Sequence, residues 1–338
     1  MTIPLQDLSR ENLMEWRSIA VANSSFFQTP DWVMSWWRHL AGRPPTTAAL
    51  WRDSRGALDA IAWVSEVTER LHPRVPVAVP LLVNAGSGLG AADHCGFPGA
   101  AVRGSEIQAW IDTLAGNVRL QNLGEPDRFL GDGWHRVGTT ETFARSLDPH
   151  ESIALSKSMA KDLRKGGRRL ADRAVTIEVV AGQEISDVIV DALFRLHAER
   201  FDDQGIVSFF GPSRRPLLEE LIAASSERCG PVAAIARHAD SIVGVDLSFI
   251  CGARMHNYQG GWSQDYRSEG LGMQLIVASM TWARDNGVTT YDFLRGSEQF
   301  KDRFGAELRA DESFERRVGL SGVALAAKSR VRDRLRRE

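Results

Sequence analysis

Short apolar runs, separated by turn residues, divide the first half of the chain into strands and helices. They predict a helix over 26–40, strands over 48–51 and 58–64, a helix over 106–115 and a strand over 118–123. The first helix has a clear start, because Thr29 is a good N-cap residue and Pro30 suits the first helical position. Residues 53–56 read Asp-Ser-Arg-Gly, which is typical of a hairpin turn. Residues 84–104 are rich in glycine and small side chains, so we expect a long loop there.

The second half shows a longer succession of elements. The pattern predicts a basic helical segment over 156–173 that Gly166-Gly167 interrupts, strands over 175–180, 232–237, 242–250, 254–262 and 289–295, and helices over 185–201 and 217–226. In the helix over 185–201, the apolar stripe consists of Val188, Ala192, Phe194 and Leu196. Each half contains an Ala-Ala strand, a turn and a second strand, which favours two lobes of one architecture. We therefore predict a mixed α/β protein with an N-terminal lobe over 1–150 and a C-terminal lobe over 151–338.

A glycine-rich turn joins the predicted strand over 254–262 to a long helical pattern. It contains Arg267, Gly270 and Gly272 in the spacing Arg-x-x-Gly-x-Gly. Glycines let the backbone approach a phosphate closely, and free N–H groups at the positive end of a helix dipole favour an anion. We expect a ligand with a diphosphate here, and the surroundings favour coenzyme A over a dinucleotide. The alternative is a helix that begins after a tight turn and binds no ligand.

Composition narrows the class of protein. With 338 residues two domains are the better expectation, and 43% hydrophobic residues suffice for buried cores. A formal net charge of −2 argues against a surface that is basic throughout, as in many nucleic-acid-binding proteins. Cys95, Cys229 and Cys251 are far apart, which fits a reducing compartment and neither a disulfide framework nor a metal site. No apolar segment reaches the ~18 residues of a membrane span, and no signal peptide is recognisable, so we expect a soluble, cytoplasmic, metal-free protein.

One segment is strongly basic although the whole chain is nearly neutral. Its cationic residues are Lys157, Lys161, Arg164, Lys165, Arg168, Arg169 and Arg173. The segment is either a solvated helix face that links the lobes or an electrostatic track for tRNA or another polyanion. It contains few aromatic residues, which argues against stacking on single-stranded nucleic acid.

Two neighbouring motifs near the C-terminus carry a family resemblance. Residues 291–296 read Tyr-Asp-Phe-Leu-Arg-Gly, and residues 300–305 read Phe-Lys-Asp-Arg-Phe-Gly. Together they resemble the signature of the CelD/BcsL-type acyltransferases, whose fold is similar to that of the Gcn5-related N-acetyltransferases (GNAT). The similarity extends to the N-terminal lobe and the basic helix, through Phe26, Pro30, Trp32, Trp36, Trp37 and the run Arg168-Arg169-Leu170. It implies two tandem GNAT-like lobes, each with a twisted, mostly antiparallel sheet flanked by helices.

The resemblance also implies a reaction. An acyl group, most simply acetyl, would move from acyl-CoA to an amine or hydroxyl of a small-molecule or saccharide acceptor. The donor would lie where two central strands splay apart, in contact with Gln259, Gly260, Gly261, Trp262, Arg267, Gly270, Leu271 and Gly272. Fem-type aminoacyl transferases share the tandem lobes and a similar motif, so charged tRNA is the alternative donor, and an inactive scaffold is a third hypothesis. The full Arg-x-x-Gly-x-Gly match favours acyl-CoA.

Acyl transfer needs a base for the nucleophile and donors for the developing oxyanion. Backbone N–H groups of residues 259–262 are expected to hold the thioester carbonyl. Asp292 is the candidate base, and its alternative role is a structural hydrogen bond to the following turn. His256 and Tyr258 alternate along the preceding strand and therefore share a face, where each is either packed or catalytic.

The remaining candidates lie near the expected acceptor. Phe300 and Phe304 stand where many GNAT enzymes have a proton-donating tyrosine, so Tyr258 or a water would have to supply the proton. Lys301 and Arg295 are candidates for binding an anionic acceptor group, with ion pairs as the alternative. Glu199 is a candidate acceptor contact on a predicted helix, with a solvated face as the alternative.

A short polar motif stands apart from these candidates. Asp93, His94 and Cys95 are consecutive and lie within the long predicted loop. Three adjacent residues without a second pair of ligands do not make a zinc site. We expect them in a loop that lines the cleft of the first lobe.

Overall fold

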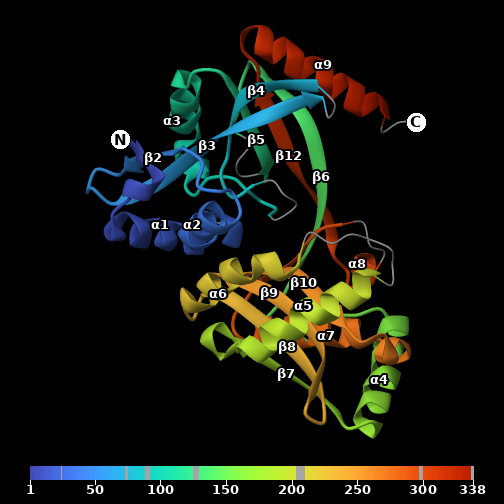
Figure 1. Ribbon diagram of the computed structural model, residues 1–338. Coiled ribbons are helices and arrows are strands. Elements are labelled where there is room, and N and C mark those ends of the chain that lie inside the picture. The colour runs from blue at the N-terminus through green and yellow to red at the C-terminus, as the bar shows by residue number, and fades with distance from the viewer. Residues whose placement is uncertain are drawn as a thin grey trace. The chain divides into compact units, whose positions relative to one another are not determined.

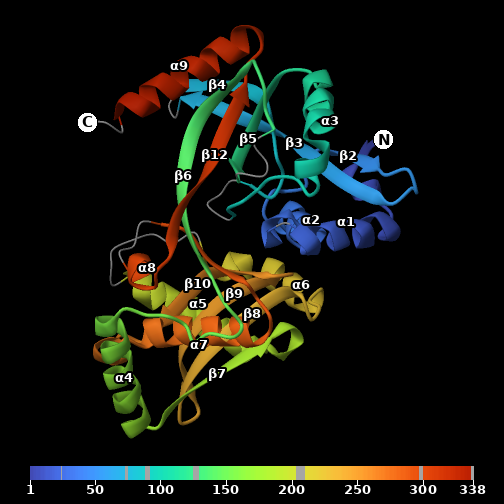
Figure 2. The same ribbon diagram turned by 180° about the vertical axis from the view of Figure 1, so that it is seen from behind.

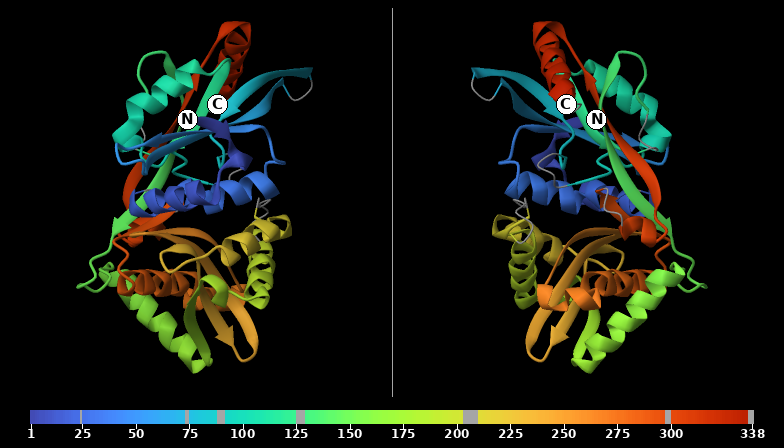
Figure 3. Two further views of the ribbon diagram at one scale, coloured as in Figure 1. Left: turned by 90° about the vertical axis from the view of Figure 1, so that its left-hand side faces the viewer. Right: turned by 90° about the vertical axis from the view of Figure 1, so that its right-hand side faces the viewer.

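The computed structural model describes residues 1–23, 25–72, 75–87, 92–124, 129–202, 210–296 and 300–335. The chain divides into two compact units (Figure 1): residues 1–140 with 310–338, here the first unit, and residues 141–309, here the second unit. The bounds of these units differ from the predicted lobes, because the C-terminal residues belong to the first unit. There the last strand pairs with an earlier one, and Leu325 of the C-terminal helix packs against Val79, Leu81 and Val83. The C-terminal helix is the red helix of Figure 3.

The first unit is a twisted sheet with helices against it. Its main elements are β1 (Thr2–Pro4), α1 (Arg10–Asn23), α2 (Pro30–His39), β2 (Thr46–Arg52), β3 (Leu58–His72), β4 (Val75–Val83), α3 (Ala100–Thr113), β5 (Asn117–Leu123), β12 (Glu307–Arg316) and α9 (Gly319–Leu335). The strand order is β1-β2-β3-β4-β5-β12, and every pair is antiparallel except β4 with β5. The predicted cap of α2 is confirmed, since the Thr29 hydroxyl accepts from the Trp32 amide at 3.3 Å.

Aromatic side chains fill the core of the first unit. Trp63 contacts Trp16 and Phe97, with ring centroids 4.6 and 5.2 Å apart. Trp32 and Trp36 are buried, as a packing role for this tryptophan cluster predicts. Their indoles bury large apolar areas, so they account for much of the stability of this unit.

The second unit contains the glycine-rich turn. Its main elements are β6 (Trp134–Ser146, from residue 141), α4 (Lys157–Asp172), β7 (Val175–Ala181), α5 (Asp187–Asp202), α6 (Arg215–Ala223), β8 (Cys229–His238), β9 (Ser241–Cys251), β10 (Arg254–Trp262), α7 (Leu271–Asp285), β11 (Thr290–Arg295) and α8 (Phe300–Arg303). The strand order is β6-β11-β10-β9-β8-β7, and only β10 and β11 are parallel. Helices α5 and α6 lie on one face of this sheet and α7 on the other (Figures 1 and 2). The predicted mixed α/β class, with mostly antiparallel sheets flanked by helices, is confirmed.

Two local predictions are wrong. Helix α4 runs through Gly166-Gly167 without a break, because Gly166 lies against another backbone. A Cβ on Gly166 would come within 2.1 Å of the Glu269 carbonyl oxygen, so the glycine permits a close helix crossing. In α5, Val188 is 65% exposed and does not belong to the buried stripe, whereas the other three predicted members do.

Candidate functional site

Strands β10 and β11 are paired only at their beginnings. The parallel register joins Arg254 to Thr290, Met255 to Tyr291 and His256 to Asp292. Beyond these pairs β10 continues along β9 to Trp262, while β11 continues along β6. The facing edges of the two strands therefore part after His256, which leaves backbone N–H and C=O groups available to an extended ligand.

A bulge re-aims β10 at the start of this gap. The register against β9 shifts between Asn257 and Gln259, so Tyr258 is the extra residue. The ring of Tyr258 lies 5.0 Å from that of Phe249, and His256 Nδ1 lies 3.3 Å from the Phe249 carbonyl oxygen. Both sequence-predicted residues thus border one phenylalanine on the α5 side of the sheet, where Tyr258 is partly exposed and His256 is buried.

The turn over residues 267–272, here the α7 turn, leads into α7. Gly270 adopts the left-handed conformation, with φ 66°, that glycine tolerates best. Its N–H donates to the Arg267 carbonyl, and its own carbonyl accepts from the amides of the next helical turn. Within the part of the chain that the structure describes, no hydrogen bond reaches the amides of Leu271 or Gly272, as is usual for a first helical turn. The side chain of Arg267 is exposed.

Trp262 covers one side of this turn. A Cβ on Gly272 would lie 2.6 Å from an indole carbon of Trp262, so this glycine makes room for the ring. The Arg200 guanidinium stacks on the same indole at 4.0 Å from the ring centroid and donates to the Gly260 carbonyl at 3.1 Å. Gly261 lies against the backbone of α5. A Cβ on Gly261 would come within 2.3 Å of the backbone nitrogen of His197. Two of the predicted donor contacts, Gly261 and Gly272, therefore have packing roles, and the open side of the turn is at Gly270, where a Cβ would meet nothing within 4 Å.

Helix α4 packs beside the α7 turn. Its carbonyl at Leu163 accepts from Gln274 Nε2 at 2.7 Å. The opposite side of the helix, here the basic face, consists of the exposed residues Lys157, Lys161, Arg164, Lys165, Arg168 and Arg169. None of these six forms an ion pair with a residue whose position is described, whereas Arg173 pairs with Glu269 at 3.4 Å. The basic face of α4 therefore adds uncompensated positive charge near the N-terminus of α7, which already favours anions.

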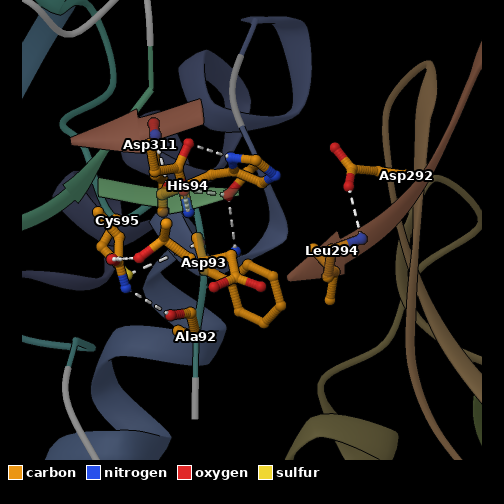
Figure 4. A network of polar contacts seen from close by, with 12 residues as sticks. Ala92, Asp93, His94, Cys95, Asp292, Leu294 and Asp311 are labelled. Carbon is orange, nitrogen blue, oxygen red and sulfur yellow. Dashed lines mark hydrogen bonds and ion pairs between the residues drawn. The ribbon is translucent and has the colours of Figure 1, made fainter. Parts of the chain in front are cut away.

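The residues after β11, 292–296, form a second turn, here the Asp292 turn. Leu294 has φ 57°, which is costly for a leucine. The Asp292 carboxylate holds it by accepting from the Leu294 amide at 2.8 Å (Figure 4). Lys301 Nζ donates to the carbonyls of Leu294, Arg295 and Gly296 at 3.3, 2.7 and 3.0 Å. The two most recognisable motif residues thus stabilise one strained turn.

These contacts give Lys301 a structural role beside its predicted one. The residue is 3% exposed and its ammonium group donates to three backbone carbonyls, so it would have to break these bonds to bind an acceptor. Arg295 ends β11 and is partly exposed. Glu199 is exposed and pairs with Arg195 one helical turn away at 3.1 Å, as its solvated alternative predicts. Phe304 is buried, and the side chain of Phe300 lies outside the described residues.

A buried polar cluster on the α7 side of the sheet was not predicted. Asp246 accepts from Asn257 Nδ2 at 2.8 Å and from Ser279 Oγ at 3.1 Å. Burial raises the pKa of Asp246 to about 6, against the lowering effect of these two hydrogen bonds. Burial also raises the pKa of the neighbouring Tyr291 well above its usual value. The only signal in the sequence was a lone carboxylate in an otherwise apolar strand.

The described residues contain neither a metal-binding cluster nor a helix that could cross a bilayer. No group of three or more His, Cys, Asp and Glu side chains within them could hold a metal ion. Within the same ranges no helix is both long and apolar enough to cross a bilayer. Cys95, Cys229 and Cys251 are buried thiols.

Comparison with known proteins identifies the domain that carries the gap and the α7 turn. Residues 157–302 match the acetyltransferase (GNAT) domain family, and no curated protein matches the chain. The structure of FemX is similar at 11% identity and a TM-score of 0.61, over 94% of this chain and 97% of that chain. The C-terminal domain of a putative lysylphosphatidylglycerol synthetase from Agrobacterium fabrum is similar at 12% identity and a TM-score of 0.57, over 93% and 94%. A conserved protein of unknown function from Bacteroides thetaiotaomicron is similar at 11% identity and a TM-score of 0.57, over 93% and 99%.

The structural likenesses extend over nearly the whole chain, so both units belong to one known fold. The sequence match adds the domain family, at a level coarser than the predicted CelD/BcsL type. Residues 157–302 are thus similar to a GNAT domain, and the chain as a whole is similar in fold to FemX.

Proposed function

We propose that the protein transfers an acyl group, most simply acetyl, from acyl-CoA to an amine or hydroxyl of a small-molecule or saccharide acceptor. One observation carries this proposal: β10 and β11 part after three residue pairs, on the strand that leads into the α7 turn. A pantetheine arm is long, thin and rich in amides, so it can bond to strand edges in such a gap. Its diphosphate then needs a positive terminus of the kind that α7 supplies.

The donor contacts follow from this placement. The strand edge over Gln259, Gly260, Gly261 and Trp262 would bind the thioester end, and Arg267, Gly270, Leu271 and Gly272 would bind the diphosphate. Since Trp262 covers Gly272, we propose that the diphosphate approaches from the Gly270 side. The basic face of α4 supplies charge for further phosphate groups.

The residues near the proposed acceptor have different roles. His256, Tyr258 and Asp292 stand at or just beyond the point where the strands part, and Tyr258 is the partly exposed member. We propose Tyr258 as a proton donor to the leaving thiolate, and Asp292 as the residue that fixes the edge of the gap through Leu294. Arg295 and Glu199 remain proposed acceptor contacts, and cytoplasmic location remains a prediction.

A second candidate function is an aminoacyl-tRNA-dependent transferase that forms amide bonds. The basic face of α4 favours it, because six exposed cations without ion pairs among the described residues suit a long polyanion. The fold similarity to FemX is compatible with either donor. The two functions differ in salt dependence, since tRNA binding through several phosphates weakens steeply with salt.

Calorimetric titration with acetyl-CoA tests the donor. We expect saturable binding that Gly270→Val abolishes, because valine is strongly disfavoured at positive φ and the turn would change shape. Gly287→Val is the matched control, since Gly287 has φ 73° at the other end of the same helix. Absence of heat with acetyl-CoA, together with a salt-sensitive mobility shift on charged tRNA, would favour the second candidate. Equal binding by both glycine variants would exclude the α7 turn as the diphosphate site.

A further inference from the structure

Two of the three cysteines face each other across neighbouring strands of the second unit. Cys229 begins β8 and Cys251 ends β9, and the antiparallel register pairs these two residues directly. Both residues are 1% exposed. Side chains that are paired across two strands point to the same face of a sheet, so the two thiols lie side by side although they are far apart in the sequence.

The backbone hydrogen bonds show which kind of pair the two cysteines form. The Cys229 amide donates to the Ser226 carbonyl at 3.2 Å, and the Cys229 carbonyl accepts from the Ser226 amide at 2.8 Å. The Gly252 amide donates to the Arg228 carbonyl at 2.8 Å, one residue beyond each cysteine. This bond is the one that flanks a non-hydrogen-bonded pair, in which the two Cα atoms are about 4.5 Å apart and the side chains approach closely.

This separation is within reach of a disulfide. The Cα atoms of disulfide-bonded cysteines usually lie about 4.4–6.8 Å apart, and most often about 5.5–6 Å apart. A non-hydrogen-bonded pair lies at the short end of this range, so the bond can close without a change of register, but with strain. Strained disulfides are reduced more easily than relaxed ones, and such labile bonds suit a response to the redox state better than permanent stability.

The pair lies beside the strand that carries the gap. Cys251 is also paired with Arg254, the first residue of β10, across the turn at the end of β9. A disulfide would therefore join the beginning of β8 to the turn from which β10 starts. At this end of the sheet β10 is still paired with β11, so the bond would stiffen the paired end and leave the gap itself open.

We propose that Cys229 and Cys251 are a redox-sensitive pair, which a low-molecular-weight disulfide such as oxidised glutathione converts into a disulfide; this inference is independent of the proposed function. The thiolate of one cysteine attacks a sulfur of oxidised glutathione and displaces one glutathione thiolate. The other cysteine thiolate attacks the protein sulfur of this mixed disulfide and displaces the second glutathione. The two cysteines are oxidised, one glutathione disulfide is reduced to two glutathione molecules, and these take up the two thiol protons. Because both cysteines are buried, the first attack needs a local opening of the strand ends and is expected to be slow.

The test exposes the folded, full-length protein to glutathione buffers with an increasing ratio of the oxidised to the reduced form. Remaining thiols are then blocked with N-ethylmaleimide, and the digested protein is analysed by mass spectrometry. We expect a peptide link between Cys229 and Cys251 that grows with this ratio and disappears with dithiothreitol. Cys95→Ser is the matched control, since Cys95 is also 1% exposed but belongs to the first unit, and it should form the link to the same extent.

A second measurement reports the effect of the link on the structure. Amide hydrogen exchange at Gly252 is expected to slow by about tenfold on oxidation of the wild type and to stay unchanged in Cys251→Ser. Absence of the link in the folded wild type, in buffers that oxidise the urea-unfolded wild type, would overturn the inference. Glutathione that stays attached to Cys229 or Cys251 without formation of the link would overturn it as well, because the two sulfurs would then be too far apart to react. Unchanged exchange at Gly252 in the linked protein would overturn the proposed stiffening of the turn.

Discussion

Asp292, in the turn after β11, and Asp311, on β12, are both 2% exposed, but the two carboxylates have different partners. Asp292 accepts from an amide only two residues further along the chain. Asp311 accepts from the amide of His94, which is 217 positions away, at 2.7 Å, and its other oxygen lies 2.8 Å from Nδ1 of the same residue (Figure 4). A carboxylate in a recognisable motif can thus stabilise a local turn, while one outside any motif can hold the backbone and ring of a residue that is distant in the sequence. A motif can be recognised in a sequence only when its residues contact one another locally, because only then is the spacing between them fixed.

The largest expected effect concerns the Asp292 turn, which Lys301 also stabilises. Lys301→Met would leave the carbonyls of residues 294–296 without their buried donor. We expect a loss of about 3 kcal/mol in the free energy of unfolding, since hydrogen bonds to a charged group contribute about 1.5–3 kcal/mol and buried acceptors are costly to leave unpaired. Urea unfolding would measure it, with the exposed Lys157→Met as control. A loss as small as that of the control would show that Lys301 is available to a substrate.

A third buried carboxylate, Asp246, differs from the first two because it is expected to make the free energy of unfolding depend on pH. Its pKa in the folded protein is about 6, above the usual 3.8, so the folded state takes up a proton before the unfolded state does. Burial of the charge therefore opposes folding by about 3 kcal/mol above pH 6, and this penalty disappears as the pH falls towards 4. We expect the stability advantage of Asp246→Asn over the wild type to be about 3 kcal/mol larger at pH 8 than at pH 4.

Titration of His197 changes the stability of the protein in the opposite direction over the same pH range. Burial lowers its pKa from 6.5 to about 4, so the unfolded state takes up a proton first and stability falls as the pH drops between these values. The two groups offset one another in the wild type, and Asp246→Asn should therefore unfold more steeply with acid. Urea unfolding at pH 8, 6 and 4 would measure the difference. Parallel pH profiles for the two proteins would mean that Asp246 is ionised throughout.

The next prediction tests whether Asp292 is structural or catalytic. Asp292→Ala removes the acceptor of the Leu294 amide, and we expect a loss of about 2 kcal/mol, in the range for a buried donor left unsatisfied. Asp292→Asn keeps an acceptor oxygen, so its stability and its pH profile of kcat/KM are expected to stay close to those of the wild type. The measurement pairs urea unfolding with a pH–rate profile. A large loss of kcat/KM in Asp292→Asn without loss of stability would instead favour Asp292 as the base.

The sequence predicted the elements with strong local signals and missed those that depend on distant partners. Strand β10, the α7 turn and the Thr29 cap follow from alternation, glycine spacing and capping chemistry over a few residues. The pairing of β12 with β5 and the contact of Asp311 with His94 join residues about 200 positions apart, which no local pattern encodes. The surroundings of Lys301 could not be predicted for a related reason. A lysine beside a motif shows its charge in the sequence, but not the carbonyls that surround its ammonium group.

The smallest expected effect concerns the α7 turn, where Gly272 packs against Trp262 and Gly270 is the proposed contact for the donor. Gly272→Ala would place a methyl group 2.6 Å from the indole of Trp262, so the ring must shift. We expect a loss of about 1 kcal/mol in stability, at the low end for overpacking, because Trp262 is partly exposed and can move. Acetyl-CoA affinity is expected to change less than threefold, because the proposed approach of the diphosphate is from the Gly270 side. Trp262→Phe should relieve the clash. Urea unfolding and calorimetry on the single and double variants would measure both effects. A large loss of affinity without loss of stability would mean that the donor contacts the turn from the Trp262 side.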